Sequence, residues 1–306
     1  MARHERHVRV SGWWPAVPGV LAVAAAVREI FIDLFQPSGS GTLSSYVGRW
    51  IFQIARRLKF LLGIAGPLAL VIVIGCWTFL LAAGFALIYA SSYPDQFSMQ
   101  GAPRRGFSEF ITLLAFSLAS LTTVGTPDLS PKADWIRLAV AVESLVGFSL
   151  VTASISWIVL LYPALGRMRS LARRSAILVN AQKKTGVQAV SENSETLLSE
   201  LTGDVIRTRV DLIHFPLIYY FHADAERASL ALALLTIDQI AQDARKVEGA
   251  NRVRLQAAML ETALGDLAKV LAHRFVSADA DDPRAVFDAF AKDHLAGEKE
   301  RDKQQG

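Results

Sequence analysis

Two long stretches of the chain consist almost entirely of apolar residues. Residues 61–90 contain no charged side chain, and residues 135–165 contain only Arg137 near the start and Glu143 within the stretch. A helix of about 20 apolar residues can cross a bilayer, so both stretches are long enough. Between them lie residues 107–121, which are apolar but too few for a crossing. The pattern predicts two membrane-spanning helices with a short helix between them.

Basic residues follow the second apolar stretch and precede the first. Before the first stretch the chain has Arg49, Arg56, Arg57 and Lys59, and after the second it has Arg167, Arg169, Arg173, Arg174, Lys183 and Lys184. Lysine and arginine accumulate on the cytoplasmic side of membrane helices. We therefore expect a multi-pass protein of the inner (plasma) membrane with both termini in the cytoplasm. The short helix then enters the membrane from outside and returns, which requires surrounding protein or a water-filled path.

The first of three predicted domains, residues 1–60, is a basic segment with interfacial amphipathic helices. Residues 13–35 begin apolar and end with Arg28, Glu29 and Asp33, so we interpret them as a helix on the membrane surface. A crossing helix is the alternative. Residues 44–60 mix aromatic, aliphatic and basic side chains, which fits an amphipathic helix on the anionic inner leaflet. The alternative is a solvated basic segment that leads to the first span.

Residues 61–165 form the second predicted domain, with the two spans, and residues 166–306 form a helical cytoplasmic domain. Leucine and isoleucine recur at helical spacing in residues 223–247 and 251–275, and a final short helix is expected near 285–296. The sequence has no βαβ alternation and no glycine-rich phosphate loop. The predicted fold class is an all-α membrane protein.

Composition narrows the function classes. Cys76 is the single cysteine, which excludes an internal disulfide and a multi-cysteine metal site. No nucleophile–base pair or ligand cluster indicates an enzyme or a metal site. The basic residues near the apolar stretches sit in two short blocks, which is typical of membrane-flanking charge and not of a nucleic-acid interface.

The candidate site follows the short helix directly. It comprises Thr122, Thr123, Val124, Gly125, Thr126, Pro127 and Asp128. Threonine and valine favour an extended chain, glycine permits a positive φ, and proline cannot donate a hydrogen bond. An extended segment with few internal hydrogen bonds has free carbonyl groups, which in a symmetric ring can replace the hydration shell of an ion. The negative carboxyl end of the short helix favours cations there. An ordinary outer turn is the alternative.

Glu143 is a carboxylate inside a predicted span, where ionisable residues are costly and often functional. One interpretation places it near the candidate site, where it stabilises a cation or bonds the short helix. The other makes it a hydrogen-bonded residue that ties neighbouring helices together through Thr112, Ser117 or Ser120. Both interpretations remain open from the sequence.

These residues resemble the bacterial two-transmembrane potassium channel family. The family's filter reads Thr-Val-Gly-Tyr-Gly-Asp, and Thr123, Val124, Gly125 and Asp128 occupy the matching places. The run from Glu143 to Gly147 also resembles the Glu-x-x-Val-Gly of bacterial inward-rectifier-like channels. The resemblance covers residues 61–165, about a third of the chain, in order, spacing and topology.

The resemblance implies a homotetramer in the lipid bilayer that conducts monovalent cations passively, with a permeant cation such as potassium in place of a cofactor. It implies that Gly147 is a gating hinge, that Glu143 is pore-supporting, and that the selectivity filter consists of Thr122, Thr123, Val124, Gly125, Thr126 and Asp128. Thr126 and Pro127 replace the family's tyrosine and glycine, so the outermost ion sites are expected to be remodelled.

A second hypothesis is a non-conducting membrane sensor or scaffold derived from a channel. Its function would reside in the helical cytoplasmic domain, whose ligand or partner the sequence does not indicate.

Overall fold

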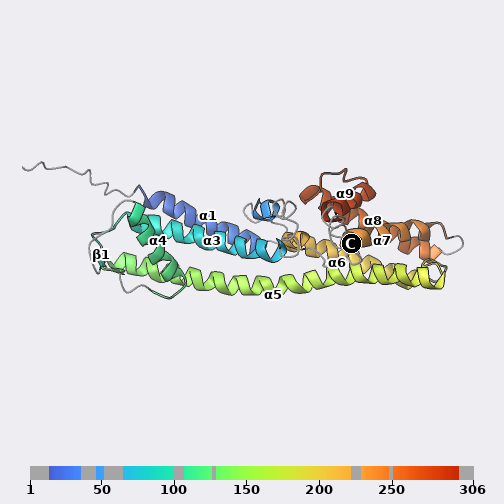
Figure 1. Cartoon of the computed structure of the whole chain (residues 1–306), viewed down its shortest axis with the longest axis horizontal. Coiled ribbons are helices and arrows are strands. Elements are labelled where there is room, and N and C mark those ends of the chain that lie inside the picture. Colours follow the sequence, from blue (N-terminus) through green and yellow to red (C-terminus); the bar gives the residue numbers. More distant parts are fainter. Residues whose placement is uncertain are drawn as a thin grey trace, which may run out of the picture. The chain divides into compact units, whose positions relative to one another are not determined.

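The chain is mostly helical in its computed structural model. The structure describes residues 14–35, 46–51, 65–99, 107–125, 129–221, 229–247 and 251–295. Within these ranges the elements are α1 (Ala16–Phe35), α3 (Ala65–Ala90), β1 (Phe97–Met99), α4 (Phe107–Leu121), β2 (Leu129–Pro131), α5 (Asp134–Thr185), α6 (Glu195–His214), η2 (Pro216–Tyr220), α7 (Leu230–Arg245), α8 (Asn251–Arg274) and α9 (Pro283–Leu295) (Figure 1).

Two helices of the described chain are long and apolar enough to cross a membrane. These are α3 and α5, whose segments Gly66–Ala90 and Asp134–Thr185 each contain an 18-residue window with a mean hydropathy of 2.5 and 2.0, respectively. The shorter apolar helix α4 lies between them in sequence, as predicted. The predicted all-α membrane fold is therefore confirmed. Helix α5 has 52 residues and continues through Pro163 and the basic residues beyond the apolar stretch. Its charged half needs no bilayer, because helix formation does not depend on apolar side chains.

The described residues divide into two compact units. One contains α1 and Ile72–Trp157, and the other contains the described parts of Gln36–Val71 and Ile158–Gly306. Helices α3 and α5 each contribute residues to both units. The predicted domain boundaries at residues 60 and 165 stay predictions.

In the first unit, α1 lies alongside α3 (Figure 1). The two backbones approach closely at a pair of glycines: a Cβ atom on Gly19 would lie 2.6 Å from the carbonyl oxygen of Gly84, and one on Gly84 would lie 2.8 Å from Val23. Gly19 also faces Ile88, so α1 runs antiparallel to α3. Small residues permit such close packing of membrane helices. Helix α1 is not one of the two described helices that are long and apolar enough to cross a membrane, so its surface position and the crossing alternative both stay predictions.

In the second unit, α8 packs against α6, α7 and α9, and α7 also packs against α9. Helices α7 and α8 lie close to the positions that the leucine spacing predicts, and α9 lies close to the short helix expected near residues 285–296. The described helical residues 46–51, part of the predicted amphipathic helix, pack on η2. There a Cβ atom on Gly48 would lie 2.5 Å from the Tyr220 ring, while Trp50 is exposed.

Candidate functional site

The site begins where α4 ends, and the chain there forms a Schellman motif. The N–H group of Thr123 donates to the carbonyl oxygen of Ser120 at 3.0 Å, and that of Val124 donates to Ala119 at 2.9 Å. The N–H group of Gly125 also donates to Ala119, at 3.2 Å. Thr123 has a φ of +61°, in the left-handed region that glycine usually occupies in this motif. The last carbonyls of α4 thus receive donors from the residues that follow the helix.

These bonds fix the direction of the neighbouring carbonyl groups. Three successive N–H groups point back towards α4, whereas successive N–H groups of an extended strand point to opposite sides. Because the peptide unit is planar and trans, its C=O points opposite to its N–H. The carbonyl oxygens of Thr122, Thr123 and Val124 therefore point away from α4. Among the residues that the structure describes, none donates a hydrogen bond to them. Val124 is 79% exposed.

The prediction of an extended segment with few internal hydrogen bonds is thus wrong for residues 122–125. The physical reason is the unsatisfied end of α4, which the following amides cap. The prediction that Gly125 permits a positive φ is confirmed, since its φ is +71°. The row of free carbonyl groups arises from alternating signs of φ at Thr123, Val124 and Gly125. Thr126 and Asp128 lie outside the described residues, as does Pro127.

Glu143 lies between α3, α4 and α5 and has no exposed surface. The Tyr89 hydroxyl of α3 donates to its Oε2 at 2.8 Å, and the Ser117 hydroxyl of α4 donates to its Oε1. Ser120 instead donates to the carbonyl oxygen of Phe116. This is the geometry of a carboxylate that ties three helices together. Its pore-supporting role stays a prediction.

Tyr89 belongs to this site although no sequence pattern predicted it there. A tyrosine at the end of a span is typical of the membrane interface, but Tyr89 is completely buried. A signal was present: a buried tyrosine hydroxyl needs an acceptor, and Glu143 is the only carboxylate in the two apolar stretches.

Helix α5 holds the end of α4 at two further positions. The Ser144 hydroxyl donates to the carbonyl oxygen of Ser120 at 2.9 Å. One turn later, a Cβ atom on Gly147 would lie 1.9 Å from the carbonyl oxygen of Leu121. The absence of a side chain therefore allows the two backbones to meet. The role of Gly147 as a gating hinge stays a prediction, and close packing is a separate reason for glycine at this position.

A two-stranded ribbon flanks α4 and the site in the chain, with β1 before α4 and β2 after the site. Strands β1 and β2 pair antiparallel, with Phe97 opposite Pro131 and Met99 opposite Leu129. The carbonyl oxygen of Gln96 accepts the N–H group of Lys132 at 2.9 Å. This ribbon was not predicted from the sequence, because three-residue strands are too short to show an alternating pattern.

An apolar stripe on α5 is exposed in the single chain. Side chains that are 47–68% exposed recur every three or four residues at Leu138, Val142, Leu145, Phe148, Val151 and Ile155. The adjacent positions Ser149, Thr152 and Ser156 carry exposed hydroxyl groups that bond within the helix. Such a continuous stripe requires lipid or another protein surface to cover it.

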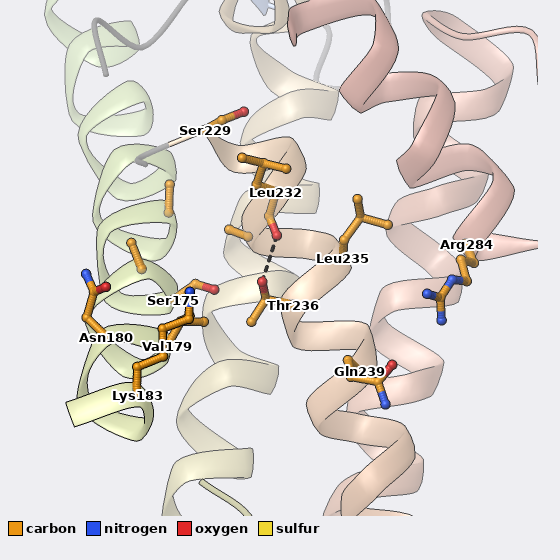
Figure 2. A pocket seen from close by; sticks show the side chains of 13 residues that line it. Ser175, Val179, Asn180, Lys183, Ser229, Leu232, Leu235, Thr236, Gln239 and Arg284 are labelled. Atoms are coloured by element: carbon orange, nitrogen blue, oxygen red, sulfur yellow. Dashed lines mark hydrogen bonds between the residues drawn. The ribbon is translucent and has the colours of Figure 1, made fainter. Parts of the chain in front are cut away.

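A groove in the second unit is a separate candidate. It has a volume of about 560 Å³ and lies between α5, α7 and α9 (Figure 2). Small residues on facing helices, including Ala172, Ala176 and Ala233, leave the space open. Lys183 and Arg284 line it, and none of its described lining residues is a carboxylate. The described residues contain no group of three or more potential metal ligands from histidine, cysteine, aspartate and glutamate.

Residues 68–161 match a protein family described as "Ion channel". This range begins in α3, includes α4 and the site, and ends in α5. The chain is also similar to the uncharacterized membrane protein YdjJ of Bacillus subtilis (strain 168), with 22% identity over 234 residues that cover 73% of this chain and 67% of that protein. No solved structure matches the chain significantly. Residues 68–161, with two membrane-spanning helices around α4 and its free carbonyl groups, are thus similar to the ion channels that this family model describes.

Proposed function

We propose that the chain is one subunit of a homotetrameric channel that conducts monovalent cations, with potassium as the permeant ion, through a filter at Thr123–Gly125. The observation that carries the proposal is the row of carbonyl oxygens of Thr122, Thr123 and Val124, which point away from α4 without a described donor. Carbonyl oxygens of this kind can replace the water molecules around a cation. No catalytic step is involved, and the permeant cation takes the place of a cofactor.

The electrostatics at the end of α4 favour cations over anions. The carboxyl end of a helix carries about half a negative elementary charge, which adds to the partial charges of the free carbonyl groups. Glu143 lies behind α4, where its hydrogen bonds to Tyr89 and Ser117 fix the position of the helix. In this proposal Glu143, Tyr89 and Ser117 support the filter on the side away from the ion, and the free carbonyl oxygen atoms face the path of the ion.

Four copies are proposed because one chain supplies only one row of oxygen atoms. An ion that loses its water shell needs ligands on all sides, and rotational symmetry supplies them from identical chains. The exposed apolar stripe of α5 from Leu138 to Ile155 is a suitable surface for contact between subunits. The exposed hydroxyl groups of Ser149, Thr152 and Ser156 would then face the water-filled path or a neighbouring helix.

The proposed location is the inner membrane, with a multi-pass arrangement and the helical C-terminal domain in the cytoplasm. The basic residues that follow the apolar part of α5 support this orientation. The amino terminus lies in the cytoplasm if α1 rests on the membrane surface, and outside if α1 crosses beside α3.

Flux through liposomes that contain the purified full-length chain tests the proposal. We expect potassium efflux under a potassium gradient, and we expect Gly125→Val to abolish it, because the left-handed backbone that turns the carbonyl groups disfavours a β-branched residue. Gly186→Val is the matched control: Gly186 has a φ of +70° and equally open surroundings, but lies in the second unit.

The absence of flux for every monovalent cation would refute the proposal, and so would equal loss of flux in the two glycine variants. Planar bilayers with potassium on one side and sodium on the other then give the permeability ratio. Chemical cross-linking of the protein in its liposomes should yield species of up to four chains.

The groove of the second unit favours one alternative, a non-conducting sensor or scaffold. Its volume of about 560 Å³ is within the range of small-molecule sites, and the cations Lys183 and Arg284 suit an anionic ligand. A folded protein that passes no cation but gains thermal stability from an anionic metabolite would favour this alternative. Filling the groove by Ala233→Trp should remove that gain.

A further inference from the structure

We propose that the groove between α5, α7 and α9 binds a water-soluble organic anion, and that the Ser175 hydroxyl and the Lys183 ammonium group hold its carboxylate or phosphate. This inference goes beyond cation conduction, because ligand binding can be measured whether or not the chain conducts. It gives a chemical role to Ser175, which no sequence pattern singles out.

The Ser175 hydroxyl is buried and available. The side chain is 2% exposed, and in Figure 2 it points from α5 into the groove. A serine or threonine inside a helix commonly donates to the carbonyl oxygen four residues earlier, as Thr152 and Ser156 of the same helix do at 3.0 Å. Ser175 forms no hydrogen bond with any residue that the structure describes. Its donor can therefore serve an oxygen atom of a ligand.

Lys183 supplies a positive charge on the same side of α5. Ser175, Val179 and Lys183 follow one another at intervals of four residues, so they share one face of the helix. Side chains on a helix lean towards its amino terminus, and in Figure 2 the Lys183 side chain runs back towards Ser175. Within the described ranges, Lys183 has no ion-pair partner. The hydroxyl and the ammonium group can thus meet one anionic group of a ligand.

The charges around the groove favour an anion over a cation. Arg284 of α9 lines the groove on the side away from α5, and no described lining residue is a carboxylate. Arg284 interacts electrostatically with Asp238 of α7, so the protein already offsets part of its charge. The anionic group is therefore assigned to the side of the groove that Lys183 lines.

The remaining walls suit an apolar carbon body. They consist of leucine, valine and alanine side chains, among them Val179, Leu232 and Leu235, around a volume of about 560 Å³. This volume lies in the range of small-molecule sites. The lining residues of α5 start at Ala172, beyond the apolar stretch that ends at residue 165 and beyond the first basic residues after it. Such basic residues mark the water side of a membrane helix, which favours a soluble anion over a lipid headgroup.

The test is an NMR titration of the full-length chain in phosphatidylcholine nanodiscs with three probes. Hexanoate has both a charge and a carbon body, acetate has the charge alone, and hexanamide has a similar body without the charge. We expect hexanoate to bind about tenfold more tightly than acetate, because the burial of about two methylene groups gives that ratio. Hexanamide should bind more weakly than hexanoate. Phosphatidylglycerol in the nanodiscs should not compete, and competition would identify a lipid headgroup as the occupant and overturn the inference.

Ser175→Ala tests the buried donor. It should weaken hexanoate binding by about ten- to a hundredfold, the range for one hydrogen bond to a charged group. Because the hydroxyl has no described partner in the free protein, the change should not lower the midpoint of thermal unfolding. A serine with a purely structural role would show the reverse, a lower midpoint and unchanged affinity. Thr236→Val is the matched control: Thr236 also lines the groove, but its hydroxyl already donates to the carbonyl oxygen of Leu232 at 2.9 Å.

Lys183→Gln tests the charge. It should weaken hexanoate binding by about two- to fivefold, since an exposed ammonium group is screened by water and salt. Lys184→Gln is its control, because the neighbouring lysine does not line the groove. Unchanged affinity in Ser175→Ala overturns the inference, as does an equal fall in the two lysine variants or equal binding of hexanamide and hexanoate. Should Ser175→Ala fail to fold, the exposed position 183 decides. A chain that binds hexanoate in this way but passes no cation refutes the proposed function and supports the ligand site.

Discussion

The contact between Gly147 and the end of α4 gives the sharpest prediction for stability. In Gly147→Ala, the new Cβ atom would lie 1.9 Å from the carbonyl oxygen of Leu121 and 2.7 Å from its carbonyl carbon. Side-chain Cβ atoms essentially never approach other heavy atoms more closely than 3.0 Å. The two backbones must therefore separate by about 1.1 Å at this point, the difference between 3.0 and 1.9 Å. A flexible side chain could move aside, but both contacts are with main chain.

The expected cost follows from packing. Inserting one carbon into a filled space typically costs about 1–3 kcal/mol, and contact with a rigid backbone belongs at the upper end. In the opposite direction, alanine is about 1 kcal/mol better than glycine inside a helix. We expect a net loss of about 1–2 kcal/mol in the free energy of unfolding. The separation should also weaken the bond from Ser144 to Ser120, which spans the same contact.

Gly166→Ala is the matched control in the same helix. A Cβ atom on Gly166 would meet nothing within 4 Å, so this variant should gain up to about 1 kcal/mol from helix propensity alone. Both variants can be unfolded with denaturant in mixed micelles, and amide exchange can be followed over residues 117–125. We expect opposite signs for the two changes, and faster exchange only in Gly147→Ala. Equal stability of the two variants would refute the close contact and leave a flexible hinge as the reason for glycine.

Three further predictions concern other parts of the chain. The Arg167 guanidinium binds the buried Asp211 carboxylate through two hydrogen bonds of 2.9 and 2.6 Å. Arg167→Ala leaves this buried carboxylate without the guanidinium, so it should lower the free energy of unfolding by about 1–3 kcal/mol. Asp211→Ala should cost less, because the half-exposed arginine regains water, and the opposite order in denaturant unfolding would contradict this account. Burial, with smaller contributions from neighbouring acids, raises the pKa of Asp238 above its ordinary value of 3.8. The folded protein therefore holds the proton of this carboxyl group more tightly than the unfolded chain does. The stability that this preference provides is complete below pH 3.8 and is lost as the pH rises through the pKa of the folded state. Asp238→Asn should therefore stabilise the protein near pH 7 but not below pH 3.8, and a gain that does not depend on pH would show that the carboxylate is not the cause. Finally, the position of α1 can be tested by single cysteine variants in a chain whose Cys76 is replaced by serine. If α1 packs antiparallel on α3 across the membrane, Val17→Cys should react with a membrane-impermeant thiol reagent from the same side of the membrane as Ser92→Cys. Reaction of Val17→Cys from the opposite side would support a surface position for α1.

The membrane fold could be predicted from the sequence because its cause is local. A run of about 20 apolar residues is stable in lipid only as a helix, whatever the rest of the chain does. The short helix α4 and helices α7 and α8 could also be predicted, because the spacing of their apolar residues is a local feature of the sequence. The length of α5 could not be predicted in this way, since the change from apolar to basic residues marks the end of the hydrophobic stretch and not the end of the helix.

The candidate site could be located from the sequence, but its backbone could not be described. Threonine and valine favour extended chain, yet the unsatisfied carbonyl groups of α4 draw the next amides back and place Thr123 at a positive φ. Residue preference is a weak local term, and the capping bonds outweighed it. For Glu143, the sequence left two interpretations and three partners open, because the choice depends on which hydroxyl groups the packing of three helices brings within reach.

What the sequence determined by itself is the set of elements that burial in lipid requires, together with the order and spacing of filter-like residues between them. What only the tertiary structure decided are the contacts between elements: Tyr89 on Glu143, Gly147 against Leu121, and Gln96 on Trp135. Each of these joins residues that are more than twenty positions apart, so no local pattern in the chain can encode it. They depend on how whole elements pack, and this packing holds the end of α4, whose capping bonds direct the carbonyl groups through which we propose that the ion passes.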